Sequence, residues 1–272
     1  MGVCDTTAIK AVHSDYKLAN RGKETPIRFA ALAAIYDPQT IRHLEAVGVA
    51  CGWRCLEVGA GSGTIAKWLA NRVGPTGYVL ATDVDTRFLE PLRGPNLDVR
   101  PHDIGRDPLP YAEFDLIHTR LVLMHVRERD TALARMVSRL KVGGWLLVEE
   151  YDSCSIAPDP TLRSGEVLLQ THIAMLRLLE DGGVNRRYGR LLSGLLREGG
   201  LTSVGASAQV FMWQSGSPGV AMMRANFEQL REAMIEANYI TAQQFDEDLS
   251  RLDNPRFMMP SSILWSAWGR RS

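Results

Sequence analysis

"LEVGAGSGTIAKWLA" (residues 56–70) joins a short apolar run to a helical pattern. Gly59, Gly61 and Gly63 place three glycines in five positions at that junction. At the junction between a parallel strand and the following helix, glycines lack Cβ atoms, so their backbone N–H groups can approach a ligand closely. The N-terminus of the helix favours negative charge nearby. The stretch predicts a ligand-binding turn in an α/β sheet. A glycine-rich turn without a ligand is the alternative.

The spacing of these glycines separates two classes of ligand. In a dinucleotide fingerprint counted from Gly59, the third glycine would fall at position 64, which is Thr64. Glu57, two residues before the first glycine, would add negative charge beside a pyrophosphate. The pattern therefore disfavours an NAD-dependent oxidoreductase. It suits a ligand with cationic groups, such as S-adenosylmethionine, which has an ammonium, a sulfonium and no phosphate.

The rest of the chain alternates short apolar runs with helical patterns, which predicts a parallel sheet with right-handed crossovers. A break at Asp37-Pro38 divides residues 26–50 into two expected helices, and Gly48 ends the second. The expected strands are 54–58, 78–83, 97–101, 114–118, 142–151, 203–213 and 261–271. The expected helices are 64–73, 129–140, 161–181 and 188–200, followed by a mostly helical insertion over 218–250.

The pattern Glu57-x-Gly59-x-Gly61-x-Gly63 resembles motif I of the class I S-adenosylmethionine-dependent methyltransferases, and in particular of small-molecule bacterial members with a type 11 or type 25 methyltransferase domain. The resemblance covers about residues 50–151, and Val142 stands where the family usually has proline. Four later segments resemble family motifs in the same order: "ATDVD" (81–85), "PHDIGRDPLP" (101–110), "FDLIHTRLVLMHV" (114–126) and "LKVGGWLLVEE" (140–150).

The resemblance implies a Rossmann-like, doubly wound, seven-stranded, mostly parallel sheet with an antiparallel last strand. It divides one compact unit into an N-terminal helical lid (1–50), a cofactor-binding core (51–155) and a C-terminal half with helical insertions over the substrate (156–272).

The resemblance also implies the contacts with S-adenosylmethionine. Asp83 would hold the ribose hydroxyls, Asp103 would meet the adenine amino group, and Arg120 would lie beside the methionine part. Arg120 has an alternative as a salt-bridge partner of Glu150 or Asp152. The complete expected set is Glu57, Gly59, Ala60, Gly61, Gly63, Asp83, Val84, Asp103, Ile104, Thr119 and Arg120, with Tyr16 and Arg21 from the lid. The alternative for the lid is a helix that only packs on the sheet edge.

Methyl transfer relies mainly on positioning, and a base helps when the acceptor is a hydroxyl. His118 ends the predicted strand at 114–118 and is the candidate general base; lining the pocket or bonding the backbone are the alternatives. His125 and His172 are weaker candidates, for which packing is the commoner role. We expect no metal site, and Asp115 should cap or bond backbone.

Methionine is concentrated in the C-terminal half. Met adapts to irregular apolar shapes, so these side chains either line a hydrophobic acceptor pocket or pack the added helices. The residues concerned are Met175, Met212, Met222, Met223, Met234, Met258 and Met259, with Trp213, Phe227, Tyr239 and Trp265.

We therefore expect an enzyme that transfers a methyl group to an oxygen or nitrogen of a small apolar or aromatic metabolite. One alternative is a cofactor-binding enzyme of the same fold that catalyses cyclisation or rearrangement without methyl transfer. A non-catalytic ligand-binding relative is another, disfavoured because Glu57, the glycines, Asp83 and Asp103 are all present.

The amino-acid composition indicates which classes of partner and which cellular location to expect. The 31 basic and 31 acidic residues cancel, and no basic run exceeds a pair, so we expect no nucleic-acid partner. The four cysteines form no CxxC pair, which favours free thiols in a reducing cytoplasm. No stretch resembles a signal peptide or a membrane span, so we expect a cytoplasmic protein without a membrane partner. The oligomeric state stays open, with a homodimer as one option.

Overall fold

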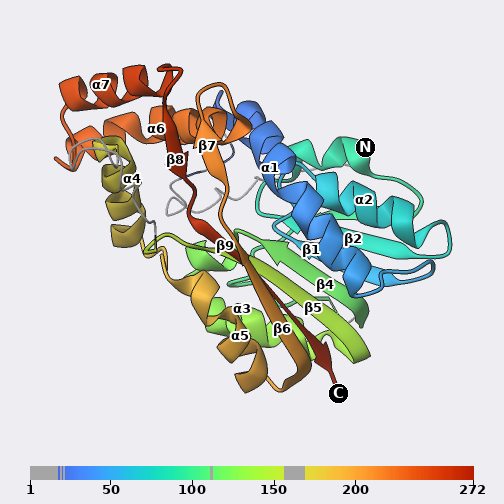
Figure 1. The fold of residues 1–272 in the computed structure, drawn as a ribbon. Coiled ribbons are helices and arrows are strands. Elements are labelled where there is room, and N and C mark those ends of the chain that lie inside the picture. Colours follow the sequence, from blue (N-terminus) through green and yellow to red (C-terminus); the bar gives the residue numbers. More distant parts are fainter. Residues whose placement is uncertain (1–17, 19, 21, 111–112, 156–168) are drawn as a thin grey trace, which may run out of the picture.

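The structure is a computed structural model that describes residues 18, 20, 22–110, 113–155 and 169–272 (Figure 1). Its centre is a seven-stranded sheet of order β3-β2-β1-β4-β5-β9-β6. Only β9 runs antiparallel to its neighbours β5 and β6. The expected doubly wound sheet with an antiparallel last strand is therefore confirmed. The strands are β1 (Arg54–Val58), β2 (Tyr78–Asp83), β3 (Leu97–Pro101), β4 (Phe114–Arg120), β5 (Leu140–Asp152), β6 (Leu201–Gln209) and β9 (Ile263–Arg271).

Helices cover both faces of this sheet. The cluster that includes Leu44, Leu69 and Leu116 joins α1 (Thr25–Ala46) and α2 (Thr64–Val73) to one face. The cluster that includes Met136 and Leu192 joins α3 (Arg129–Ser138) and α5 (Tyr188–Glu198) to the other. Three short 3₁₀ turns cover Thr86–Phe88, Glu90–Leu92 and Leu123–His125. Because β1, β2 and β4 are covered on both sides, most of their residues are buried and their sequences are apolar runs, whereas the edge strands β3 and β6 are largely exposed or half-buried.

The expected break at Asp37-Pro38 is wrong. α1 continues through Pro38 as one helix of 22 residues. Proline removes one backbone hydrogen bond inside a helix, but packing on both sides of this point holds the helix together, since Tyr36, Thr40 and Leu44 are buried. Gly48, with φ +89°, follows the end of the helix as expected.

A cap of helices and a small two-stranded sheet lies beyond the carboxyl ends of the strands (Figure 1). The expected strand at 203–213 is divided between β6 and the separate strand β7, and the insertion at 218–250 forms two helices. For the expected helix at 161–181, residues 161–168 lie outside the described part of the chain. The cap elements are α4 (Gln170–Asp181), β7 (Met212–Gln214), α6 (Pro218–Glu236), α7 (Ala242–Leu252) and β8 (Met258–Pro260).

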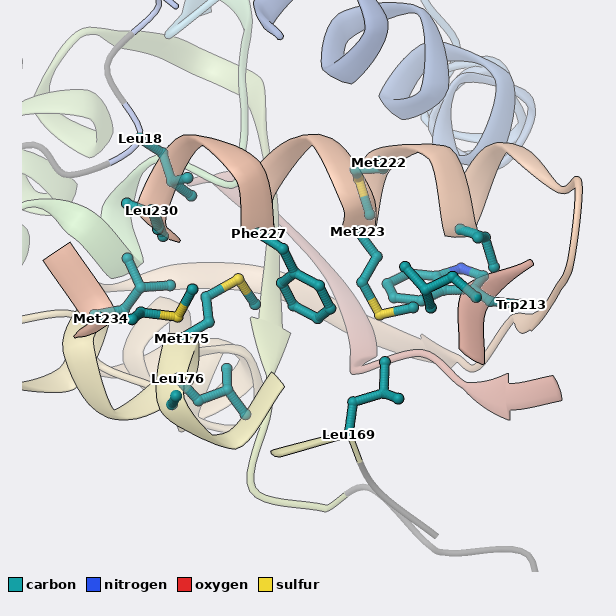
Figure 2. Close-up of a cluster of buried hydrophobic side chains, with 14 of the residues drawn as sticks. Leu18, Leu169, Met175, Leu176, Trp213, Met222, Met223, Phe227, Leu230 and Met234 are labelled. Atoms are coloured by element: carbon teal, nitrogen blue, oxygen red, sulfur yellow. The ribbon is translucent and has the colours of Figure 1, made fainter. Parts of the chain in front are cut away.

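The cap has a hydrophobic core of its own. Figure 2 shows Met175 and Leu176 of α4 opposite Met223 and Phe227 of α6. Met234 is fully buried in this cluster, whereas Met212 and Met258 are exposed. Five of the seven methionines thus pack in the cap, and three of these five, Met175, Met222 and Met223, also line a cavity.

Candidate active site

A cavity of about 350 Å³ lies between the sheet and the cap. One half is lined by residues at or just after the carboxyl ends of strands, among them Glu57, Asp83 and Arg120. The other half is lined by α4, β7 and α6. Crevices at the carboxyl ends of parallel strands are where open α/β sheets bind ligands. The cavity is therefore the candidate active site.

The glycine loop requires its glycines. Gly59, Gly61 and Gly63 have φ of +68°, +57° and +76°, where other residues are strained. A Cβ at Gly59 would lie 2.2 Å from the Val122 side chain, and one at Gly63 would lie 2.3 Å from that of Leu92. Gly59, Ala60 and Gly61 line the cavity, whereas Gly63 lies outside its lining and lets the start of α2 pack closely. The loop thus combines a ligand-facing part with a packing part.

Glu57 is buried, and its side chain lines the cavity. It lies directly opposite His118 in the parallel pairing of β1 and β4. The Nδ1 atom of His118 is 2.7 Å from Oε2 of Glu57, and its Nε2 atom is 3.4 Å from Oε2 of Glu149. His118 is fully buried and does not line the cavity. Contrary to the sequence-based expectation, His118 is not placed to take a proton from an acceptor there.

The protonation state of His118 follows from its two neighbours. Burial disfavours the charged ring, but the carboxylates of Glu57 and Glu149 outweigh it and raise the pKa of His118 to about 9. Burial likewise disfavours the charged form of Glu149, yet hydrogen bonds from His118 and His43 hold the pKa of this carboxyl well below its usual range. Thr40 and Ser266 also donate to Glu149. A positively charged imidazole thus lies behind the cavity carboxylate Glu57.

Asp83 meets the glycine loop from the neighbouring strand. Its Oδ2 accepts the N–H of Gly61 at 2.9 Å, and its Oδ1 accepts the N–H of Asp85 at 3.0 Å. Burial raises the pKa of Asp83, although both backbone hydrogen bonds oppose the rise. Val84 follows on the cavity wall. The structure therefore brings the predicted ribose carboxylate and the glycine loop together.

Asp103 and Ile104 line the cavity after β3. Ile104 is buried in the sheet core, and Asp103 accepts the N–H of Gly105 at 2.9 Å. Nε of Arg106 is 4.0 Å from the other carboxylate oxygen of Asp103. Ile104 thus offers an apolar surface beside the half-exposed carboxylate of Asp103 on the same cavity wall.

Of the neighbouring residues Thr119 and Arg120, only Arg120 lines the cavity. The Thr119 hydroxyl donates to the Val58 carbonyl at 3.0 Å inside the sheet, and Thr119 is not among the cavity-lining residues. Arg120 lines the cavity and donates to Thr40 at 2.8 Å and to Asp37 at 2.7 Å. Its salt bridge is therefore with α1, and neither of the two acids considered from the sequence is its partner.

Several cavity-lining residues belong to no sequence motif, and two expected site residues lie outside the described part of the chain. Tyr16 and Arg21 lie outside the described residues. On α4, His172 occupies the same helix face as Met175, Leu176 and Leu179, and all four line the cavity. The signal is a histidine within an apolar helical stripe. His172 and Met175 are candidates from the sequence, whereas the lining residues that sequence reasoning missed include Leu18, Arg28, Phe29, Tyr151, Ser153 and Asn226.

The described residues contain no cluster of three or more His, Cys, Asp or Glu side chains able to hold a metal ion. Asp115 accepts the backbone N–H of Arg54 at 2.7 Å and pairs with Lys141 at 2.8 Å, which confirms its structural role. Among the described helices, none has the length and apolar character needed to cross a membrane.

The polar groups of the cavity fit S-adenosylmethionine. Glu57 offers negative charge to a cationic group, and Asp83 and Asp103 offer acceptors for hydroxyl and amino groups. Gly59 and Gly61 expose backbone in between. A ligand of this kind needs no fixed metal.

Residues 56–148 match the family model of the methyltransferase domain. The ubiquinone/menaquinone biosynthesis C-methyltransferase of Laribacter hongkongensis is 35% identical over 114 residues, which cover 40% of this chain and 47% of the relative. Methyltransferase str2 of Strobilurus tenacellus is 34% identical over 146 residues, covering 51% and 50%. The chain thus spans about half the length of these curated relatives.

Solved structures agree on the fold. Haemonchus contortus phosphoethanolamine N-methyltransferase 2, in complex with S-adenosyl-L-methionine, superposes with a TM-score of 0.58 at 16% identity, covering 97% of this chain and 61% of that one. The YcgJ protein of Bacillus subtilis has a TM-score of 0.57 at 15% identity, covering 87% and 100%. Residues 56–148 thus resemble a methyltransferase domain, and the fold is the one that this S-adenosyl-L-methionine complex also has.

Proposed function

We propose that this protein is an enzyme that binds S-adenosylmethionine in the sheet half of the cavity and transfers its methyl group to a small apolar or aromatic molecule in the cap half. The observation that carries the proposal is the meeting of Glu57, Asp83 and the glycine loop on one wall of one cavity. The cap supplies the apolar wall opposite.

Each cofactor group has a candidate partner. The Glu57 carboxylate would accept hydrogen bonds from the cofactor ammonium, Asp83 from the ribose hydroxyls, and Asp103 from the adenine amino group. Ile104 and Val84 would flank the adenine and ribose. Arg120, held by Asp37 and Thr40, would lie near the cofactor carboxylate. Charge-assisted hydrogen bonds of this kind are the strong ones in a buried site.

The bound cofactor supplies an electrophilic methyl group on a sulfonium. The protein's part is to hold the acceptor in line with the carbon–sulfur bond and to exclude water. Well-oriented reactants gain much of their rate from this placement alone, up to roughly 7–11 kcal/mol of barrier. The enclosed position of the cavity between sheet and cap supports such a mechanism.

Oxygen or nitrogen is the acceptor atom expected from the sequence. Carbon is a second candidate, because relatives named as C-methyltransferases match about two fifths of this chain. The attacking atom belongs to the acceptor, so the same cavity serves either reaction. We expect the cytoplasm as the location and leave the oligomeric state, a homodimer included, to measurement.

Calorimetric titration of the purified protein with S-adenosylmethionine, S-adenosylhomocysteine and NAD tests the proposal. We expect micromolar binding of the first two and none of NAD. Formation of S-adenosylhomocysteine with a panel of phenols, amines and carbon acceptors then tests turnover, and the product's NMR spectrum locates the new methyl group. Binding of NAD in preference to S-adenosylmethionine would overturn the proposal.

A further inference from the structure

The cap half of the cavity contains one buried histidine among apolar side chains. His172 is 4% exposed, and neither Nδ1 nor Nε2 has a hydrogen-bond partner among the described residues. Met175 and Leu176 lie on the same face of α4, and Met222 lies across the cavity on α6. The Phe227 ring meets the imidazole edge-on, with centroids 6.3 Å apart. Buried polar groups without partners are uncommon and invite an explanation.

The imidazole of His172 is neutral near physiological pH. Burial and the nearby positive charge of Arg186 lower its pKa to about 4. A neutral imidazole presents one N–H donor and one bare nitrogen acceptor. A buried polar group left unpaired costs about 1–3 kcal/mol, so a ligand that pairs with either nitrogen recovers this cost.

The described carboxylates around the cavity leave no counter-charge for a cationic acceptor beside this ring. The carboxylates that line it, Glu57, Asp83, Asp103 and Glu128, all belong to the sheet half. In the cap half, the guanidinium of Arg186 donates to Glu180 at 3.0 Å and to the carbonyl of Ser153 at 3.3 Å. A cationic acceptor would therefore find no described counter-charge beside His172.

Two further cavity-lining groups in the cap also have unpaired polar atoms. Oδ1 of Asn226 and Nε1 of Trp213 have no hydrogen-bond partner among the described residues. With His172 they form a sparse set of polar points on an apolar wall. Few convergent polar groups on an apolar surface are typical of small-molecule sites, where they fix the orientation of the ligand.

We propose that His172 is an acceptor-binding residue, and that it hydrogen-bonds the hydroxyl group of an uncharged, largely apolar acceptor. A hydroxyl can donate to the bare nitrogen or accept from the N–H, so it suits either tautomer. The inference rests on the proposed function and deepens it by naming the acceptor's chemistry. It concerns a residue outside the matched domain segment 56–148.

The test uses the full chain saturated with S-adenosylhomocysteine and a matched pair of probes, 2-naphthol and 2-methylnaphthalene, which differ in one hydroxyl. Fluorescence titration gives both dissociation constants for the wild type and for three variants. His172→Phe removes both nitrogens and keeps a flat ring, and His172→Gln keeps one donor and one acceptor. Ile173→Phe changes the next residue of α4, which is 43% exposed and outside the cavity lining, and serves as the control.

We expect the wild type and Ile173→Phe to bind 2-naphthol at least about tenfold more tightly than 2-methylnaphthalene, as one buried hydrogen bond allows. His172→Phe should lose this preference, and His172→Gln should keep part of it. The affinity for S-adenosylhomocysteine should stay within about twofold in every variant, which also shows that each variant folds.

The inference is overturned if His172→Phe keeps the preference for 2-naphthol, or if the cofactor-loaded wild type shows no such preference. Failure of the proposed function looks different, since the wild type would then not bind S-adenosylhomocysteine at all. Chemical shifts of the His172 ring nitrogens give a second readout. They should move when 2-naphthol is added and stay in place with 2-methylnaphthalene.

Discussion

Glu57 and His118 are cross-strand partners on β1 and β4, and a carboxylate oxygen of the first lies 2.7 Å from Nδ1 of the second. Glu57 faces the cavity, whereas His118 is fully buried behind it. A charged imidazole in this place fixes the direction of the carboxylate and compensates part of its burial cost. Under the proposed function, the histidine that first suggests a catalytic base would therefore act on cofactor binding, through Glu57.

His118→Asn should weaken binding of S-adenosylmethionine by about tenfold or more and lower the free energy of unfolding by roughly 3–5 kcal/mol, because it leaves buried carboxylates without their cation. Calorimetry and urea denaturation measure the two effects. The double variant His118→Asn/Glu149→Gln removes one of the unpaired charges and should regain part of the stability. Wild-type affinity and stability in His118→Asn would contradict this role.

The same pair predicts a pH dependence of stability. The folded-state pKa of His118, about 9, lies above its unfolded value of about 6.5, so the folded chain holds the proton more tightly. The stabilisation is complete below about pH 6.5 and is lost as the pH rises through about 9. Urea denaturation from pH 6 to 10 should show a larger loss for the wild type than for His118→Asn. Parallel curves for the two proteins would contradict the prediction.

Glu150→Gln should stabilise the protein at neutral pH by roughly 1–3 kcal/mol. Burial raises the pKa of Glu150 to about 8, although the N–H groups of Val122 and Leu123 donate to it. Its contribution to stability therefore falls between about pH 4.5 and 8, where the unfolded chain releases the proton more easily. Glutamine keeps the acceptor oxygen without the charge.

Thermal unfolding at pH 5 and pH 7.5 checks this effect of Glu150→Gln. The gain should appear mainly at the higher pH. Glu228→Gln, at an exposed position of α6, is the matched control and should change little at either pH. A destabilised Glu150→Gln protein at pH 7.5 would show that the carboxyl is needed in its charged form.

Asp83→Ala should weaken the binding of S-adenosylmethionine by about 1–3 kcal/mol, the cost of leaving ligand hydroxyls unpaired. The variant also frees the N–H of Gly61, which Asp83 accepts at 2.9 Å. Calorimetric titration measures the loss. Asp246→Ala, on the exposed side of α7, serves as the control. An unchanged dissociation constant in Asp83→Ala would remove this residue from the ribose site.

Gly59→Ala should destabilise the fold and abolish cofactor binding. At φ +68° the new Cβ would lie 2.2 Å from the Val122 side chain, so the loop must shift. Gly194→Ala in α5 meets nothing within 4 Å and should instead stabilise the protein by about 0.5–1 kcal/mol. Thermal unfolding of both variants tests the contrast. Equal melting temperatures would contradict it.

The sequence predicts the first half of the sheet well. The elements at 54–58, 64–73, 78–83 and 97–101 have the predicted bounds, because buried strands and their crossover helices carry strong local signals. Pro38 shows the limit of such signals, since the packing that keeps α1 continuous comes from distant segments. β7 and β8 pair only with each other, across a long separation in sequence. A local sequence pattern therefore does not predict the pairing of β7 with β8.

In the candidate site, too, some features follow from local sequence motifs and others depend on contacts between distant segments. Glu57, Gly59, Gly61, Asp83 and Asp103 follow from motifs, and all five line the cavity. The role of His118 depends on Glu149, a neighbour that only the pairing of β4 with β5 provides. The placement of His172 depends on how α4 lies over the sheet, which the histidine's local sequence does not encode.

The separate core of the cap has a consequence for how this protein can change. Leu169, Phe227 and Met234 hold the cap elements to one another, and cavity-lining side chains of α4 and α6, such as Met175 and Met223, belong to the same buried cluster. Exchanges among these cavity-lining side chains alter the packing of the cap and leave the residues of the glycine loop unchanged. Under the proposed function, a library of variants at these positions would keep the cofactor-binding residues, and its members would differ in the acceptor molecules that they bind.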